Sequence, residues 1–149
     1  LTIGPDLLIM KDGTDKWVEV KRKDEPTYFW KFHEWQHGID LPNIRAYQKI
    51  AKETRRPFVI LVHEINSPAT PNLYLHLMDD VSAHRRMQAD LQPIETWLSI
   101  SLDDAIRCGN SRPGNPQMMD KDNPHGFGFY WPRAKMQQIE WETVCSQAA

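Results

Sequence analysis

The sequence predicts an α/β fold with a mixed central β-sheet flanked by helices. Two short segments, residues 6–10 and 17–22, stand on either side of the turn signal Asp12-Gly13, which predicts a β-hairpin. Residues 40–54 carry apolar side chains at helical spacing, and residues 58–62 form the continuous apolar run that is typical of a buried central strand. A hairpin followed by a helix and a buried strand places parallel and antiparallel strands in one sheet.

The composition fits one folded domain. The chain has 149 residues, of which 40% are hydrophobic and 26% are charged, so we do not expect global disorder. A net charge of −2 gives no overall attraction for nucleic acid. More than half of the 18 lysines and arginines nevertheless lie between Lys11 and Arg56. We therefore expect a polyanionic partner to contact the first third of the chain.

Cysteine usage and hydropathy indicate the compartment. Cys108 and Cys145 lie far apart without metal-ligand spacing, as expected of reduced thiols in a cytoplasmic protein. No apolar run approaches the length of a membrane span, and no signal peptide is visible. We therefore expect no membrane partner.

The predicted hairpin carries the side chains with the clearest chemistry. Asp6 opens its first strand, and Glu19 and Lys21 lie on its second. Because strand side chains alternate, Glu19 and Lys21 should share a face with Trp17, while Val20 points the other way. Carboxylates bind hard cations such as Mg²⁺, and a bound cation acidifies water and neutralises a phosphoryl oxygen. A neighbouring lysine can orient that water or stabilise the developing charge.

Pro5-Asp6 followed by Glu19-Val20-Lys21 resembles the motif of the PD-(D/E)xK nuclease superfamily, which includes many restriction enzymes and Holliday-junction resolvases. The resemblance implies a restriction-endonuclease-like core and a metal-dependent nuclease that hydrolyses phosphodiester bonds in DNA. It implies that Asp6, Glu19 and the carbonyl of Val20 bind Mg²⁺ or Mn²⁺, and that Lys21 assists the attacking water. Asp6, Glu19 and Lys21 are then the catalytic residues. The alternative interpretation of this pattern is a solvated charge pair on the outer face of a hairpin.

The resemblance covers the segment from Asp6 to Val62. The family core has the order helix, three strands, helix, strand, and only the opening helix has no counterpart after Leu1. We therefore expect an upstream segment to supply that helix, which often carries a further acid in the family. Residues 1–149 are interpreted as one domain, with the nuclease-like core at 1–64 and a family-specific elaboration at 65–149.

The junction between the third strand and the helix also resembles some phage and prokaryotic members, which suggests a prokaryotic or phage source. It consists here of residues 35–40 followed by Tyr47. Gln36 and Tyr47 are therefore candidates for active-site support, although Gln36 also fits an ordinary surface position. The four histidines at positions 33, 37, 63 and 76 are interpreted as hydrogen-bonded side chains rather than metal ligands.

The helix at residues 40–54 has an apolar and a basic face. Its inward stripe consists of Ile44, Tyr47, Ala51 and Thr54. A second stripe carries cations, and with Lys23 it forms the predicted DNA-binding surface: Arg45, Lys49, Lys52 and Arg56. The alternative is a solvated helix face. The neighbouring aromatic residues either stack on unpaired bases or pack in the core: Tyr28, Phe29, Trp30 and Trp35.

The remaining elements are predicted from local pattern. We expect strands at residues 28–32, 73–78, 96–102 and 127–131, helices at 81–91 and 134–141, a single helical turn at 103–106 and a loop over 109–126. Two functional alternatives to the nuclease stay open. One is a non-catalytic nucleic-acid-binding module with the same fold, and the other is a structural or partner-binding subunit. Many family members are dimers, since cutting two strands needs two sites, so a homodimer is a further open alternative.

Overall fold

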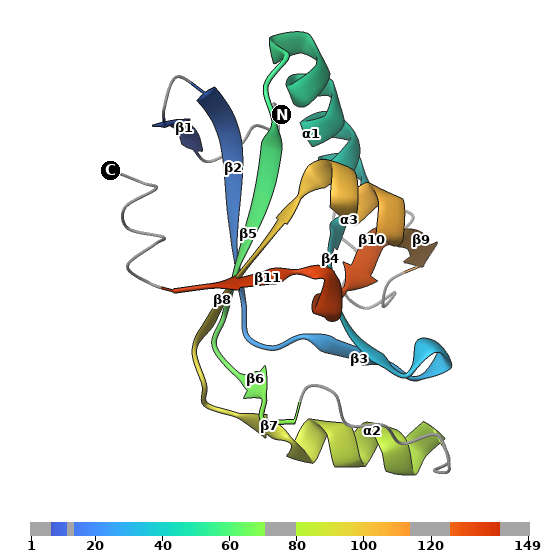
Figure 1. Cartoon of the computed structure of the whole chain (residues 1–149). Coiled ribbons are helices and arrows are strands. Elements are labelled where there is room, and N and C mark those ends of the chain that lie inside the picture. Colours follow the sequence, from blue (N-terminus) through green and yellow to red (C-terminus); the bar gives the residue numbers. More distant parts are fainter. Residues whose placement is uncertain (1–6, 12–13, 71–79, 114–125, 141–149) are drawn as a thin grey trace.

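The computed structural model describes residues 7–11, 14–70, 80–113 and 126–140, and it has a mixed α/β fold (Figure 1). The central sheet has the order β1-β2-β5-β8-β11. Its strands are β1 (Leu7–Lys11), β2 (Thr14–Lys23), β5 (Phe58–Glu64), β8 (Thr96–Ser101) and β11 (Gln137–Ile139). β2 and β5 pair in parallel, and the other neighbours pair antiparallel. The predicted mixed sheet is therefore confirmed.

A second, antiparallel sheet has the order β3-β4-β10-β9. Its strands are β3 (Thr27–Phe29), β4 (Glu34–Asp40), β9 (Asn110–Pro113) and β10 (Phe127–Pro132). A short pair joins β6 (Ser67–Pro68) to β7 (Leu91–Gln92). The described helices are α1 (Leu41–Thr54), α2 (Asp80–Ala89) and α3 (Leu102–Cys108), with 3₁₀ turns η1 (Trp30–Phe32) and η3 (Arg133–Lys135).

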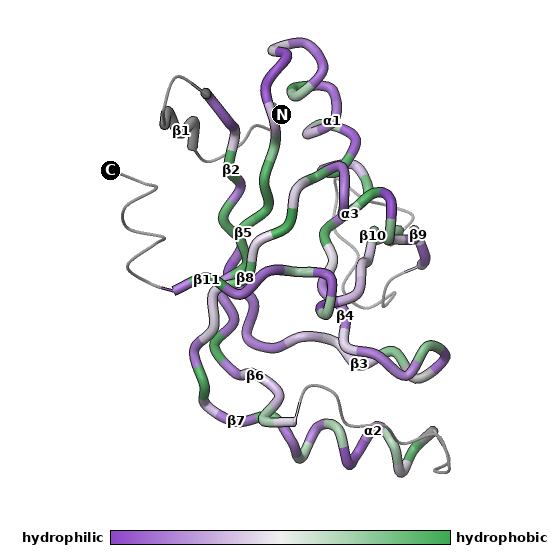
Figure 2. Tube along the Cα trace, viewed as in Figure 1, coloured by the Kyte–Doolittle hydropathy of each residue, from purple (hydrophilic) through white to green (hydrophobic). Residues whose placement is uncertain are grey.

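The main core lies between one face of the central sheet, hereafter the first face, and a layer made of α1, α3 and the second sheet. β5 contributes hydrophobic residues in the middle of the sheet (Figure 2). The buried ring of Tyr47 on α1 stacks on Phe58, with centroids 4.7 Å apart. Trp17 packs beside them, and its indole Nε1 donates to Thr54 Oγ1 at 2.9 Å. The inward stripe predicted for this helix is therefore confirmed.

The opposite, second face of the central sheet carries a smaller apolar cluster. Val18 and Leu61 are buried there, with Val20 and Trp97 packed against them. None of the three described helices packs on this face, because α1 and α3 cover the first face and α2 contacts β3, η1 and β7 (Figure 1). In the described residues the sheet is therefore covered by helices on one side only, which differs from the flanked sheet that we expected.

Several predicted elements are confirmed and others are wrong. The hairpin, α1, β5, α2, β8 and β10 agree with prediction to within a few residues. The helix expected at residues 134–141 is wrong, because η3 occupies its start and residues 137–139 pair with β8 as an edge strand. The loop expected over 109–126 begins as β9, and the helical turn at 103–106 is part of the longer α3. Of the strand expected at 28–32, only the first two residues are extended, as part of β3, because η1 begins at Trp30. The strand expected at 73–78 lies outside the described residues.

α1 ends in a left-handed residue. Arg55 has a φ of 53° and a ψ of 39°, and its backbone N–H donates to the carbonyl of Ala51. A side chain in this conformation brings its Cβ close to the backbone, whereas glycine adopts it without that clash. Arg55 is exposed, so its side chain gives little packing energy in return.

We expect Arg55→Gly to raise the free energy of unfolding by up to about 1 kcal/mol, because it relieves the left-handed cap. Lys52→Gly, one turn earlier and equally exposed, is the control and should lower it by about 1 kcal/mol. Urea unfolding followed by circular dichroism measures both. An equal decrease in the free energy of unfolding of the two variants would contradict the assignment of Arg55 as a strained helix cap.

Candidate functional site

Glu19 and Lys21 lie together on the first face of the central sheet. Glu19 pairs with Ile60 and Lys21 with Val62 on β5, so both point toward the main core. The Lys21 ammonium lies 3.0 Å from Glu19 Oε1, and Glu19 is only 4% exposed. The predicted common face of Trp17, Glu19 and Lys21 is therefore confirmed. Burial of the carboxylate also excludes the alternative of a solvated surface pair, since a buried charge is costly unless it is paired.

The other predicted metal ligands are only partly within the described structure. The side chain of Val20 packs on the second face, so only its backbone carbonyl remains as a ligand. Asp6 lies outside the described residues, and the pairing of β1 with β2 begins at Leu7, opposite Val18. Within the described residues no group of three or more His, Cys, Asp or Glu is close enough to hold a metal ion.

Lys23 continues the row formed by Glu19 and Lys21. It is half-buried and pairs with Glu64 on β5 in the strand register. Burial lowers the pKa of its ammonium, the charge of Lys21 lowers it further, and Asp40 opposes both effects. The backbone carbonyl of Lys23 accepts from the Ile65 N–H at 3.1 Å, whereas no hydrogen bond or ion pair of its ammonium is found in the part of the chain that the structure describes. The predicted DNA-binding residue Lys23 thus stands beside the candidate site rather than on the helix.

A buried ionic cluster, consisting of Glu64, His37 and Arg133, was not predicted. Glu64 is fully buried and His37 is 3% exposed. His37 Nε2 lies 2.5 Å from Glu64 Oε2, and Arg133 donates in a fork to Glu64, from Nε to Oε2 at 2.9 Å and from Nη2 to Oε1 at 2.8 Å. The cluster joins β4, β5 and η3. No local pattern indicates it, because its members lie 27 and 69 residues apart in the sequence.

The ionisation of this cluster follows from its contacts. Burial alone would raise the pKa of Glu64, but hydrogen bonds from His37 and Arg133 prevail and lower it from 4.5 to about 2. Burial lowers the pKa of His37, although Glu64 opposes that shift. At neutral pH the imidazole is therefore uncharged and donates to the carboxylate, while Arg133 supplies the compensating charge. The prediction that His37 is hydrogen-bonded is confirmed, and His63 is also bonded, to Glu95 at 2.5 Å.

The two candidates for active-site support lie elsewhere. Gln36 is 4% exposed and lies on the opposite face of β4 from His37. Its amide Nε2 donates to Glu34 Oε1 at 2.9 Å, and its Oε1 accepts from Arg112. The structure therefore does not bring Gln36 to the Glu19–Lys21 pair. Tyr47 lies in the main core against Phe58, as described above.

Three of the four cations predicted for the basic stripe lie on α1, and the fourth lies beyond the end of the helix. Arg45, Lys49 and Lys52 are exposed on α1, and Lys49 lies 4.0 Å from Glu53. Arg56 follows the helix end and lies 3.3 Å from Asp15 instead. The stripe expected from four cations is therefore a face of three.

The aromatic residues divide between core and surface. Tyr28 and Trp35 are buried edge to face, with centroids 5.5 Å apart, and pack against Ala83 and Met87 of α2. Core packing is thus the role of these two, whereas Phe29 is half-buried. The side chain of Trp30 is not among those that the structure describes.

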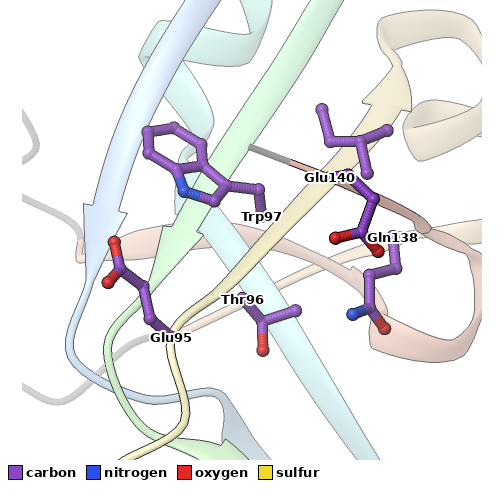
Figure 3. A pocket seen from close by; sticks show the side chains of 6 residues that line it. Glu95, Thr96, Trp97, Gln138 and Glu140 are labelled. Carbon is purple, nitrogen blue, oxygen red and sulfur yellow. The ribbon is translucent and has the colours of Figure 1, made fainter. Parts of the chain in front are cut away.

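A cavity of about 310 Å³ opens beside β8 and β11 (Figure 3). It is lined by Glu95, Thr96, Trp97, Gln138, Ile139 and Glu140. Trp97 and Ile139 belong to the second-face cluster, so the cavity is separate from the Glu19–Lys21 pair. Its two glutamates make it unfavourable for a polyanion.

Comparison with known proteins yields no match to a family model, to a curated protein or to a solved structure. Among the described residues no helix has the length and apolar character needed to span a membrane.

The ionisation of the cluster of Glu64, His37 and Arg133 makes the free energy of unfolding depend on pH. The carboxylate of Glu64 takes up a proton near pH 4.5 in the unfolded chain but only near pH 2 in the folded chain. Its contribution to the free energy of unfolding is therefore complete above pH 4.5 and is lost as the pH falls toward 2. His37 acts in the same direction below its ordinary value of 6.5, because its folded-state pKa is lowered. We expect the free energy of unfolding, measured in urea, to fall steadily from pH 7 to pH 3.

Glu64→Gln should lower that free energy by roughly 3–5 kcal/mol at pH 7, because Arg133 keeps a charge in a site without its counter-charge. The free energy of unfolding of this variant should also fall less steeply below pH 4.5 than that of the parent chain. Glu95→Gln is the control, since that carboxylate is 63% exposed and also bonds a histidine. Equal effects of the two variants would contradict a stabilising role for the cluster.

Proposed function

We propose that the chain is a metal-dependent nuclease that hydrolyses phosphodiester bonds in DNA. The observation that carries the proposal is the buried Glu19 carboxylate with the Lys21 ammonium 3.0 Å away on the same strand face. Removing these charges from water destabilises the folded domain. Buried charges of this kind are commonly found at functional sites.

The order of the elements supports a restriction-endonuclease-like core. β1 is followed by β2 with its Glu19-Val20-Lys21 sequence, then by α1, and then by β5 in parallel with β2. That order agrees with two of the three strands, the helix and the last strand of the superfamily core, whereas β3 and β4, which precede the helix, pair in the second sheet and do not continue the central one. Asp6 precedes Leu7 in the sequence, and Glu19 follows Val18, the partner of Leu7. The proposal therefore uses Asp6 and Glu19 as its two carboxylates.

The donor set fits a hard divalent cation. Two carboxylates and the backbone carbonyl of Val20 are the oxygen ligands that Mg²⁺ or Mn²⁺ prefers. Such an ion lowers the pKa of a bound water and neutralises charge on a phosphate oxygen. In this proposal Lys21, whose ammonium lies 3.0 Å from Glu19, orients the attacking water or stabilises the developing charge. Lys23, next along the row, offers a half-buried ammonium for a phosphate of the substrate.

A second candidate is a DNA-binding module without catalysis. The three exposed cations of α1, Arg45, Lys49 and Lys52, favour it, because they can contact phosphates without any metal site. Metal-dependent cleavage separates the two candidates.

Glu19→Gln should lower the rate of DNA cleavage in Mg²⁺ by about a hundredfold or more, or roughly 3 kcal/mol in activation free energy. The amide keeps the shape of the side chain but removes the charge that the cation requires. Cleavage of a labelled DNA is measured with Mg²⁺ and with EDTA, and circular dichroism checks the fold. Glu25→Gln, exposed in the β2–β3 connection, is the control. Equal rates for Glu19→Gln and the parent chain would refute the ligand role.

Lys21→Met should abolish turnover while metal affinity stays unchanged or increases. The lysine acts chiefly in the transition state, and removing a cation 3.0 Å from Glu19 ends its competition with the metal. Calorimetric Mn²⁺ titration and cleavage rates are measured on the same preparations, with Lys135→Met as an exposed control. Loss of Mn²⁺ binding together with activity would show that Lys21 is structural.

A further inference from the structure

The outer face of the second sheet carries an arginine between two aromatic rings. The guanidinium carbon of Arg112, on β9, lies 3.9 Å from the ring centroids of both Phe29 and Tyr130. These rings come from β3 and β10, so three strands build the stack. The inner face of the same sheet carries His37 and Trp131, which point toward the central sheet.

Two glycines allow the Tyr130 ring to lie flat on the sheet. A Cβ added at Gly38 would come within 2.4 Å of a carbon of this ring, and one added at Gly128 within 2.6 Å. Contacts this short do not occur, so both positions require glycine. The Tyr130 ring, which forms one side of the stack, therefore lies directly against the backbone of β4 and β10.

Arg112 is held in one orientation but keeps unused donors. One of its N–H groups donates to Gln36 Oε1, and Gln36 is itself held by Glu34. A guanidinium has five N–H groups, and this is its only hydrogen bond among the described residues. Arg112 is half-buried, so its remaining donors are open to an acceptor that the described residues do not supply.

Phe32 extends the aromatic surface outward. It is 57% exposed, and its ring meets Phe29 edge to face with centroids 5.1 Å apart. A large apolar ring exposed beside a stacked arginine is not explained by core packing, because Tyr28 and Trp35 fill the core on the inner side.

We propose that this surface, formed by Phe29, Phe32, Arg112 and Tyr130, binds unpaired nucleotides of DNA; the proposal deepens and rests on the proposed nuclease function. Phe32 offers a ring face to a base, and Arg112 offers a planar fork to a phosphate or base acceptor. In a duplex the base faces are covered by their neighbours, so only an unpaired base can stack there. Gln36 links Arg112 to the carboxylate of Glu34, which reduces the net positive charge of the surface, so we expect stacking to supply most of the affinity.

The surface and the candidate site can be varied independently. The side chains of the surface belong to β3, η1, β9 and β10, whereas Glu19 and Lys21 belong to β2 of the central sheet. Substitutions at Phe32 or Arg112 therefore leave Glu19 and Lys21 in place.

The test compares the affinities of the chain for a single-stranded oligonucleotide and for the corresponding duplex, by fluorescence anisotropy in EDTA so that no cleavage occurs. We expect the single strand to bind more tightly. Phe32→Ala should weaken its binding about tenfold and leave duplex binding unchanged. Arg112→Gln should also weaken it and should reduce the log–log salt slope by about 0.7 if a phosphate contact is lost. Ile94→Ala and Arg107→Gln, an exposed apolar residue and an exposed arginine, are the matched controls and should change nothing.

Two results would overturn the proposal. One is equal affinity for single strand and duplex, and the other is parental single-strand affinity in Phe32→Ala. Phe32 is exposed, so its variant tests the surface even if Arg112→Gln fails to fold. Binding in EDTA does not depend on Glu19. A tight single-strand complex thus supports the surface even where cleavage is absent, and failure here leaves the cleavage assays to decide the nuclease function.

Discussion

The parallel pairing of β2 with β5 is the constraint on which the core and the candidate site both depend. It sets Glu19 beside Ile60, with Lys21 two residues further along, on the face that also carries the main core. Charges on such a face are costly unless they are paired, and the Glu19–Lys21 contact meets that requirement. Parallel neighbours need a crossover, and α1 provides it while stacking Tyr47 on Phe58. The helix that permits the pairing thus also covers the sheet beside the site.

The same constraint determines how the two sheets meet. Glu64 is the last residue of β5 and lies on the first face, where no water can solvate it. His37 and Arg133 supply the hydrogen bonds that replace water, one from β4 and one from η3. A fully buried carboxylate allows few arrangements of the groups around it, because the loss of any hydrogen-bond donor leaves its charge uncompensated. The cluster therefore adds an ionic contact between the second sheet and the end of β5 to the apolar contacts of the main core.

Successive side chains of β4 alternate between the two faces of the second sheet and take part in two different clusters. His37 faces inward to Glu64, whereas Gln36 faces outward to Arg112. Between β4 and β10, Gly38 leaves the room that the ring of Tyr130 occupies, so the outer side becomes a flat aromatic surface. One short strand thus borders the buried Glu64–His37–Arg133 cluster on one side and the stacked arginine on the other.

The sequence by itself determined the features that depend on near neighbours. A period of 2 placed Glu19 and Lys21 on one face, a period of 3.6 gave the inward stripe of α1, and an unbroken apolar run gave β5. Only the tertiary structure decided that residues 137–139 are a strand, since their pairing with β8 supplies the order that local propensity lacks. It also decided the partners of Glu64 and the position of Gln36. Those contacts join segments 27 to 76 residues apart, and no local pattern encodes which buried donor a distant carboxylate or amide will meet.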